Sequence, residues 1–110
     1  EPLYRRALDL DPENALIHTN LAMLLDFDGR TTEAEAQYRR ALDLDPDDGR
    51  AHAHLAILLA RDGRRDEGEE HYVRAMEVAP DYVAAILSTL EDDTLDETNV
   101  ERPTGAPGPR

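Results

Sequence analysis

One stretch of nine residues, YRRALDLDP, occurs twice in this chain of 110 residues, at 4–12 and again at 38–46. A looser copy, YVRAMEVAP, begins at Tyr72, and residues 15–48 match residues 49–82 at almost half of their positions. A period of about 34 residues is typical of arrays of paired helices, in which each unit packs mainly on its neighbours. Function is therefore expected on an extended surface rather than in a catalytic pocket.

Each repeated unit is predicted to hold two amphipathic helices. Apolar residues recur at a helical spacing in the first whole unit, at Ile17, Leu21, Leu24, Leu25, Ala34, Tyr38, Ala41 and Leu42. Gly29 and Gly63 stand between the two helices of their units, and glycine readily takes the left-handed conformation that ends a helix. Because the turn is short, the helices of a unit are expected to run antiparallel.

The ends of these helices carry their own signals. Thr32 and Asp66, each followed three residues later by glutamate, predict caps that begin the second helix of each unit. Proline cannot continue a helix but is tolerated where one starts, so the prolines mark unit boundaries at Pro12, Pro46 and Pro80. We expect the second helix of a partial unit at 1–12 and whole units at 15–48 and 49–82.

The repeat register ends soon after the second whole unit. It continues past Tyr82 to Leu90 and fails at Asp92 and Asp93, which replace paired leucines. Residues 91–101 are strongly acidic and residues 102–110 are rich in proline and glycine, a composition that buries too little apolar surface to offset the entropy of ordering. We expect a terminal helix at 83–92 that covers the second unit, followed by a disordered tail at 93–110.

The charge, the cysteine count and the lack of long apolar segments argue against several kinds of partner and site. The 25 acidic residues outnumber 12 basic residues, all arginine, and the net charge of -13 repels nucleic acids and anionic membrane surfaces. There is no cysteine, hence no disulfide framework or thiolate metal site. The chain has no apolar run long enough to span a bilayer and no signal segment at its start, so a soluble, cytoplasmic protein is expected.

The residues that could support catalysis or metal binding lack the partners they need. His52 and His54 are two residues apart on a helix and point to different sides, while His18 and His52 occupy equivalent places and are expected to pack between helices. The acids at 43–48 imitate a calcium loop that Pro46 interrupts, and Ser88 lies in no nucleophile motif. We therefore expect no catalytic residue, no metal site and no cofactor.

The repeated positions of the two whole units resemble those of the tetratricopeptide repeat family. The first whole unit carries the family's signature at Leu21, Ala22, Leu25, Gly29, Ala34, Tyr38, Ala41 and Pro46. The second carries it at Leu55, Ala56, Leu59, Gly63, Gly68, Tyr72, Ala75 and Pro80. The resemblance covers about residues 1–90 and implies an all-α solenoid, a right-handed superhelical array of antiparallel helix pairs.

The resemblance also implies a function, because members of the family usually bind a peptide segment of a partner along a concave groove lined by the first helices. The groove would be lined here by Leu16, Thr19, Asn20, Met23, Phe27, Arg50, Ala53, His54, Ile57, Arg61 and Leu87. Arginine offers a planar pair of donors to a carboxylate. A non-catalytic interaction module is therefore expected, with a ligand that carries apolar anchors and an acidic group.

Some members of the family hold a C-terminal carboxylate with asparagine and two bases at fixed spacing. Asn20, Arg50 and His54 match three of those places, and the other two would precede residue 1. Asparagine at this place is also a frequent structural residue in the family. Ordinary packing on the helix face is the simpler interpretation of the three residues.

Two other functions are compatible with the sequence. The opening half-unit presents Leu3, Tyr4, Ala7 and Leu8, which a partner helix would cover in a complete unit, so two chains could form a homodimer or a larger assembly there. The array could also be the substrate-recognition arm of a larger enzyme.

Overall fold

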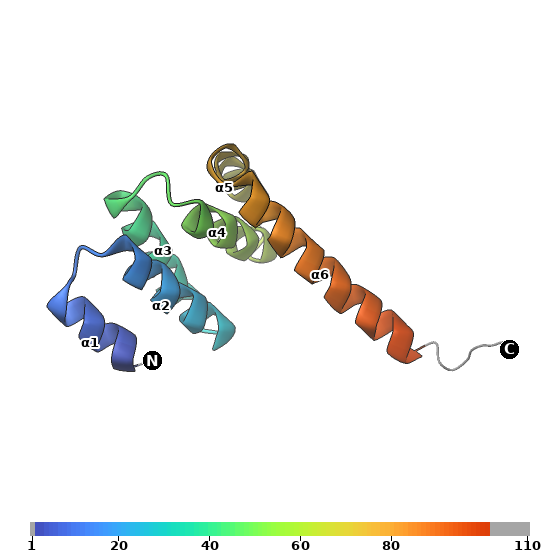
Figure 1. Ribbon diagram of the computed structural model, residues 1–110, viewed down its shortest axis with the longest axis horizontal. Coiled ribbons are helices and arrows are strands. Elements are labelled where there is room, and N and C mark those ends of the chain that lie inside the picture. The colour runs from blue at the N-terminus through green and yellow to red at the C-terminus, as the bar shows by residue number, and fades with distance from the viewer. Residues whose placement is uncertain (1, 102–110) are drawn as a thin grey trace, which may run out of the picture. The chain divides into compact units, whose positions relative to one another are not determined.

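The computed structural model describes the backbone of residues 2–101 and the side chains of residues 2–90. Within them the chain forms α1 (Pro2–Leu10), α2 (Ala15–Phe27), α3 (Thr31–Leu44), α4 (Gly49–Arg61), α5 (Arg65–Val78) and α6 (Pro80–Glu101) (Figure 1). The described residues fall into two units, one ending at Pro80 and the other beginning at Asp81. The all-α array of helix pairs that the repeats predict is confirmed. No helix in residues 2–101 combines the length and apolar character needed to cross a membrane.

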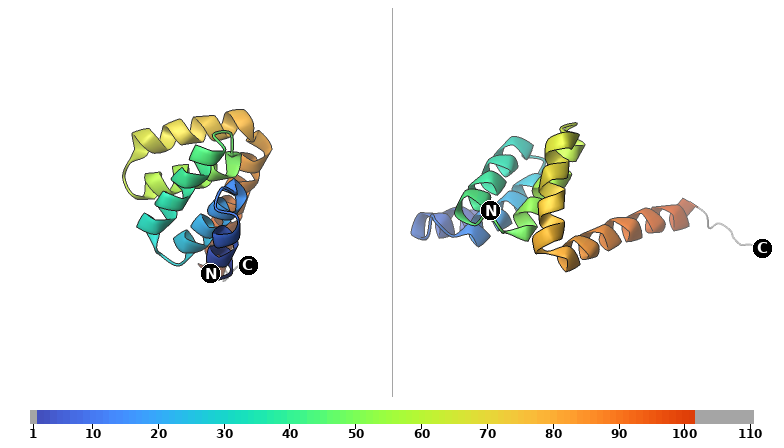
Figure 2. Two further views of the ribbon diagram at one scale, coloured as in Figure 1. Left: turned by 90° about the vertical axis from the view of Figure 1, so that its left-hand side faces the viewer. Right: turned by 90° about the horizontal axis from the view of Figure 1, so that it is seen from above.

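Helices α2 and α3 form one antiparallel pair and α4 and α5 form the next, with α3 packed on α4 and α1 packed on α2 (Figure 2). Each pair turns at a glycine, and the φ angles of Gly29 and Gly63 are 83° and 84°. The N–H of the following arginine closes each turn, with Arg30 donating to the Leu25 carbonyl at 2.9 Å. The left-handed glycines expected at the turns are therefore present.

The predicted caps of the second helices are wrong. Helix α3 begins at Thr31, α5 begins at Arg65, and neither has a side-chain hydrogen bond at its N-cap. Thr32 and Asp66 consequently lie inside the first turn. The reason is the tightness of the glycine turn, because the next helix starts at once and arginine, not a short polar residue, falls at the cap position.

The side-chain caps belong instead to the first helices. The Oδ1 atom of Asn14 accepts from the backbone N–H of Ile17 at 3.3 Å, before α2. Before α4, the Oδ1 atom of Asp48 accepts from the N–H of Ala51 at 3.1 Å. These caps fix where the two helices that line the expected groove begin.

The terminal helix differs from the expected 83–92. Helix α6 begins at Pro80, whose fixed φ suits the first helical position, and it continues to Glu101. Residues 93–101, expected in a disordered tail, are therefore helical, because acidic residues that contribute little burial do not prevent a helix from continuing. Residues 102–110 of that tail lie outside the described residues.

The core lies between the helix pairs. The fully buried large side chains are Tyr38, Leu21, Leu25, Leu55, Leu58, Leu59 and Thr19. Tyr38 of α3 is stacked with the His54 ring of α4, with ring centroids 6.4 Å apart and an angle of 6° between planes. The first whole unit is thus joined to the second by a ring contact that involves a predicted groove residue.

Candidate functional site

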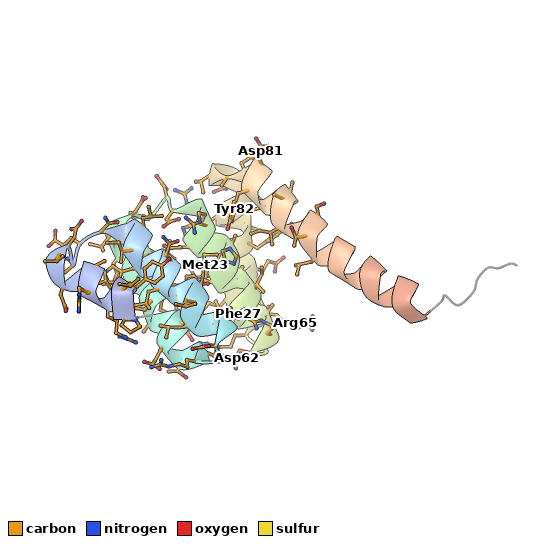
Figure 3. The ribbon with its side chains drawn as sticks, turned by 60° about the horizontal axis from the view of Figure 1, so that its bottom comes forward. Met23, Phe27, Asp62, Arg65, Asp81 and Tyr82 are labelled. Atoms are coloured by element: carbon orange, nitrogen blue, oxygen red, sulfur yellow. The ribbon has the colours of Figure 1, made fainter. Side chains whose placement is uncertain are left out.

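The candidate surface is built from exposed and half-buried side chains of α2 and α4. Leu16 is 53% exposed and Phe27 is 89% exposed, although the opposite side of α2 is fully buried. Met23 is half-buried one turn before Phe27 (Figure 3). Ile57 of α4 is also half-buried, and α2 and α4 contact each other. We call this set, with Asn20, Arg50, His54 and Arg61, the α2–α4 surface.

Arg50 ties the two helices of this surface together. One Nη2 atom donates to Asn20 Oδ1 at 2.7 Å and lies 3.2 Å from Met23 Sδ. Asn20 and Arg50 are therefore brought into contact, as the carboxylate-binding pattern requires, but they bind each other. A ligand carboxylate at this place would have to share the guanidinium with the asparagine amide.

His54 completes that group as a neutral side chain. Burial lowers the pKa of His54 most, and the positive charge of Arg50 lowers it further. Asp26 and Asp48 act in the opposite direction without cancelling these effects. A neutral imidazole donates one hydrogen bond and accepts another, so at pH 7 His54 adds no positive charge for an anionic ligand.

Arg61 supplies the second basic group of the surface. Its Nη2 atom lies 2.6 Å from Asp26 Oδ2, and the arginine side chain is 58% exposed whereas that of Asp26 is 17% exposed. The other carboxylate oxygen, Asp26 Oδ1, is buried and has no hydrogen-bond partner in the described structure. The acid beneath Arg61 is the site residue that sequence reasoning missed, because it lies in the other unit and shares no motif with the arginine.

A small cavity lies beside the same arginine. Its volume is about 120 Å³ and its lining comprises Thr31, Leu58, Arg61 and Asp62. The cavity holds both apolar and charged groups at the turn end of α4. It is large enough for a small side chain rather than for a ligand of its own.

Three of the predicted groove residues are not part of this surface. Thr19 is 0% exposed and donates from Oγ1 to Asp48 Oδ2 at 2.8 Å, and Ala53 is 5% exposed. Both lie on the side of the helix that packs against its neighbour. Leu87 is 43% exposed but belongs to α6, in the unit that begins at Asp81, and is described separately for that reason.

The predicted self-association residues of α1 have different environments. Tyr4 and Leu8 pack partly against the core and Ala7 is half-buried, so these three are less open than the expectation that all four are exposed. Helix α1 packs on α2, and these three side chains remain partly exposed. Leu3 is 79% exposed, and Leu10, which the prediction omitted, is 83% exposed.

No group of three or more potential ligands that could hold a metal ion occurs in the described part of the chain. The histidines nevertheless make close contacts. His18 contacts Gln37 of α3 and His52 contacts His71 of α5, so each of these two buried histidines joins the helices of its own repeat unit.

Comparison with known proteins supports the repeat interpretation. A sequence profile of the Tetratricopeptide repeat family matches residues 28–90, and a second profile of the same family matches residues 3–36. Among curated proteins, none matches the chain.

Several solved structures have a similar fold. MamA AMB-1 is 31% identical with a TM-score of 0.64, and the match covers 70% of this chain and 42% of that chain. MamA from Desulfovibrio magneticus RS-1 is 24% identical, with a TM-score of 0.67 and coverage of 73% and 45%. YrrB, described as a TPR protein with an unusual peptide-binding site, is 23% identical, with a TM-score of 0.69 and coverage of 80% and 45%. The chain spans less than half the length of each of these proteins.

Proposed function

The chain belongs to the tetratricopeptide repeat family, whose fold is that of a protein-interaction module, and we propose that it binds a peptide segment of a partner along the α2–α4 surface without catalysing a reaction. The observation that carries this proposal is Phe27, which is 89% exposed on a helix whose opposite side is fully buried. A large aromatic side chain interacts weakly with water, and covering it with a partner contributes favourable binding free energy.

The proposed ligand has apolar anchors for α2. Leu16, Met23 and Phe27 follow one another along the helix, and Ile57 lies on α4. A single exposed apolar residue is ordinary, whereas a row of them beside charged groups is typical of a binding surface. The exposed side of α2 runs along the helix and suits an extended or helical peptide.

The ligand is also proposed to carry an acidic group that binds at Arg61. This arginine is the more accessible of the two, and a guanidinium has five N–H donors, of which the contact with Asp26 uses only part. Arg50 is held by Asn20 and Met23, which makes it a less available donor. An aspartate, a glutamate or a free C-terminus would fit the fork of Arg61.

The test begins with peptides selected from a displayed random library on the native chain, one of which is labelled for fluorescence anisotropy. Phe27→Asp is expected to weaken binding by at least about tenfold, because it removes an aromatic anchor and adds a charge. Arg61→Gln keeps a hydrogen-bond donor for Asp26. It is expected to weaken the binding of only those peptides that contain an acidic group.

Matched controls lie on the outer helices. Val73→Asp on α5 introduces the same charge at a residue that is 49% exposed, and Arg40→Gln on α3 removes the same charge from an exposed position. Neither control is expected to change the affinity. If all four variants bind alike, or if no peptide is selected by the folded chain, the α2–α4 surface is not the binding site.

Self-assembly through α1 is a second candidate, favoured by the high exposure of Leu3 and Leu10. Sedimentation velocity over a wide concentration range is expected to show a dimer that Leu3→Glu/Leu10→Glu abolishes and Val73→Glu preserves. A monomer at every concentration would exclude this candidate. A recognition arm of a larger enzyme would use the α2–α4 surface, so the peptide-binding variants test that alternative as well.

A further inference from the structure

The two whole units bury a histidine at the same place. His18 is 7% exposed and His52 is 8% exposed. The Nε2 atom of His18 lies 2.8 Å from the Pro12 carbonyl oxygen, and that of His52 lies 2.7 Å from the Pro46 carbonyl oxygen. A carbonyl oxygen can only accept, so Nε2 carries a hydrogen in both rings.

The other ring nitrogen has a different partner in each unit. In the first unit, His18 Nδ1 lies 2.7 Å from Oε1 of Gln37. In the second unit, His52 Nδ1 lies 3.0 Å from Nδ1 of His71, and the ring centroids are 5.2 Å apart. Gln37 and His71 occupy equivalent positions of the repeat, so one substitution distinguishes the two contacts.

The number of protons that each contact can hold follows from these atoms. With both rings neutral, His52 Nδ1 accepts from the Nδ1–H of His71. One added proton still leaves a single hydrogen between the facing atoms, because the charged ring donates to the neutral one. A second added proton puts a hydrogen on both facing nitrogens, which breaks the bond and brings two positive rings into contact.

The glutamine contact has no such limit. A side-chain amide offers a carbonyl oxygen to a charged His18 and, when rotated, an NH₂ group to a neutral His18. The bond between α2 and α3 can therefore be kept in both charge states. The bond between α4 and α5 cannot be kept once both rings are charged.

The charged groups around the pair do not remove this limit. The pKa of His71 is lowered, first by burial and then by the positive charges of His52 and Arg39, the latter from α3. Glu67 and Glu70 of α5 act in the opposite direction without cancelling these effects. A folded chain that binds protons less readily than the unfolded chain loses stability as the pH falls below the ordinary histidine value of 6.5.

We propose that the His52–His71 contact is an acid-sensitive joint between α4 and α5, which stays closed with up to one added proton and opens when it takes a second. The first unit, with glutamine at the equivalent place, lacks this joint. Helix α4 carries Arg50, Ile57 and Arg61, so opening the joint would loosen one side of the α2–α4 surface in acid. The joint itself does not depend on any ligand of that surface.

The chain supplies reciprocal variants for a test. His71→Gln gives the second unit the contact of the first, and Gln37→His gives the first unit the contact of the second. Urea unfolding of the native 110-residue chain and both variants is followed by circular dichroism at constant ionic strength between pH 7.5 and pH 5. Comparison of slopes with pH separates the proton effect from any constant effect of the substitution on stability.

For each proton that the unfolded chain binds and the folded pair does not bind, the unfolding equilibrium constant rises about tenfold when the pH falls by one unit. As the pH falls below about 6.5, the unfolding equilibrium constant of the native chain is expected to rise. Its rise should exceed that of His71→Gln by about tenfold for each pH unit. The unfolding equilibrium constant of Gln37→His is expected to rise more steeply than that of the native chain by the same factor. Parallel curves for the native chain and His71→Gln would overturn the proposal.

Nuclear magnetic resonance of the imidazole nitrogens provides a decisive second measurement should Gln37→His not fold. In the native chain, the ring nitrogens of His71 are expected to take up their added proton at a lower pH than histidine in the urea-unfolded chain. If both rings of the folded chain take their protons together at the pH of the unfolded chain, the joint does not exist.

Discussion

The unit formed by α2 and α3 and the unit formed by α4 and α5 share their motif but not their burial. Tyr38 is 0% exposed, whereas Tyr72, at the equivalent place of the second unit, is 39% exposed. The first tyrosine is stacked with His54 from the following helix. The same residue at the same repeat position is therefore core in one unit and half-open in the other, because the neighbouring helix decides its burial.

Alanine substitution of the two tyrosines is the strongest test of this difference. Tyr38→Ala removes a fully buried ring and is expected to lower the free energy of unfolding by about 3–5 kcal/mol. Tyr72→Ala removes a ring that keeps much of its contact with water and is expected to cost less than half as much. Urea unfolding followed by circular dichroism measures both changes, and equal costs would show that burial does not separate the units.

The sequence predicts what is local and repeated. The helix pairs and the turns at Gly29 and Gly63 follow from periodicity and from glycine, which act within a few residues. The burial of Tyr38 and Tyr72 does not follow, since the two positions read alike. What differs between them is a contact with another helix, and periodicity carries no information about it.

The candidate site shows the same division. Leu16 and Phe27 could be placed on an exposed side of a helix from their spacing, and the structure exposes both. Thr19 could not be excluded from the surface until its hydrogen bond with Asp48 was known. The pairing of Arg61 with Asp26 joins different units and has no signal in the repeat.

The helix caps offer a second comparison, with a somewhat smaller effect. Asn14→Ala removes a cap and an exposed hydrogen bond from Nδ2 to Asp11 Oδ2, and is expected to cost about 0.5–2 kcal/mol. Asp48→Ala removes the equivalent cap and also the acceptor of the buried Thr19 hydroxyl, so about 2–4 kcal/mol is expected. The measurement is urea unfolding, with Asp48→Asn as the conservative control. The comparison breaks down if Asn14→Ala proves the more costly change.

Gly49 and Ala15 are the first residues of α4 and α2 and differ by one methyl group. A Cβ atom at Gly49 would lie 2.4 Å from Ala79 Cβ and 3.3 Å from Val78 Cγ2, so the methyl group requires α4 or the end of α5 to move. Gly49→Ala is expected to cost about 1–3 kcal/mol, although alanine is otherwise the better helix residue.

The reciprocal change Ala15→Gly is the control, because Ala15 is only half-buried and glycine there loses little more than helix propensity, about 1 kcal/mol. Thermal unfolding of the two variants gives the result. A stabilised Gly49→Ala protein would mean that the ends of α4 and α5 adjust at no cost, and the close approach would not distinguish the second unit.

The smallest expected difference concerns ion pairs repeated along the array. Arg5 lies 3.5 Å from Glu33, and the equivalent Arg39 lies 2.6 Å from Glu67 and 2.7 Å from Glu35. The side chain of Glu35 is 18% exposed, so water screens its contact with Arg39 less than it screens the looser pair.

Arg39→Ala is therefore expected to cost more than Arg5→Ala, although each remains within about 0.2–1 kcal/mol. Unfolding in low salt and in molar salt measures the electrostatic part, which salt should largely remove. The third position of this series is Val73, which has no charge, so α5 cannot extend the row of arginines. If Arg39→Ala and Arg5→Ala cost the same at low salt, the ion pairs add nothing to the difference between the units, and neighbour packing alone accounts for it.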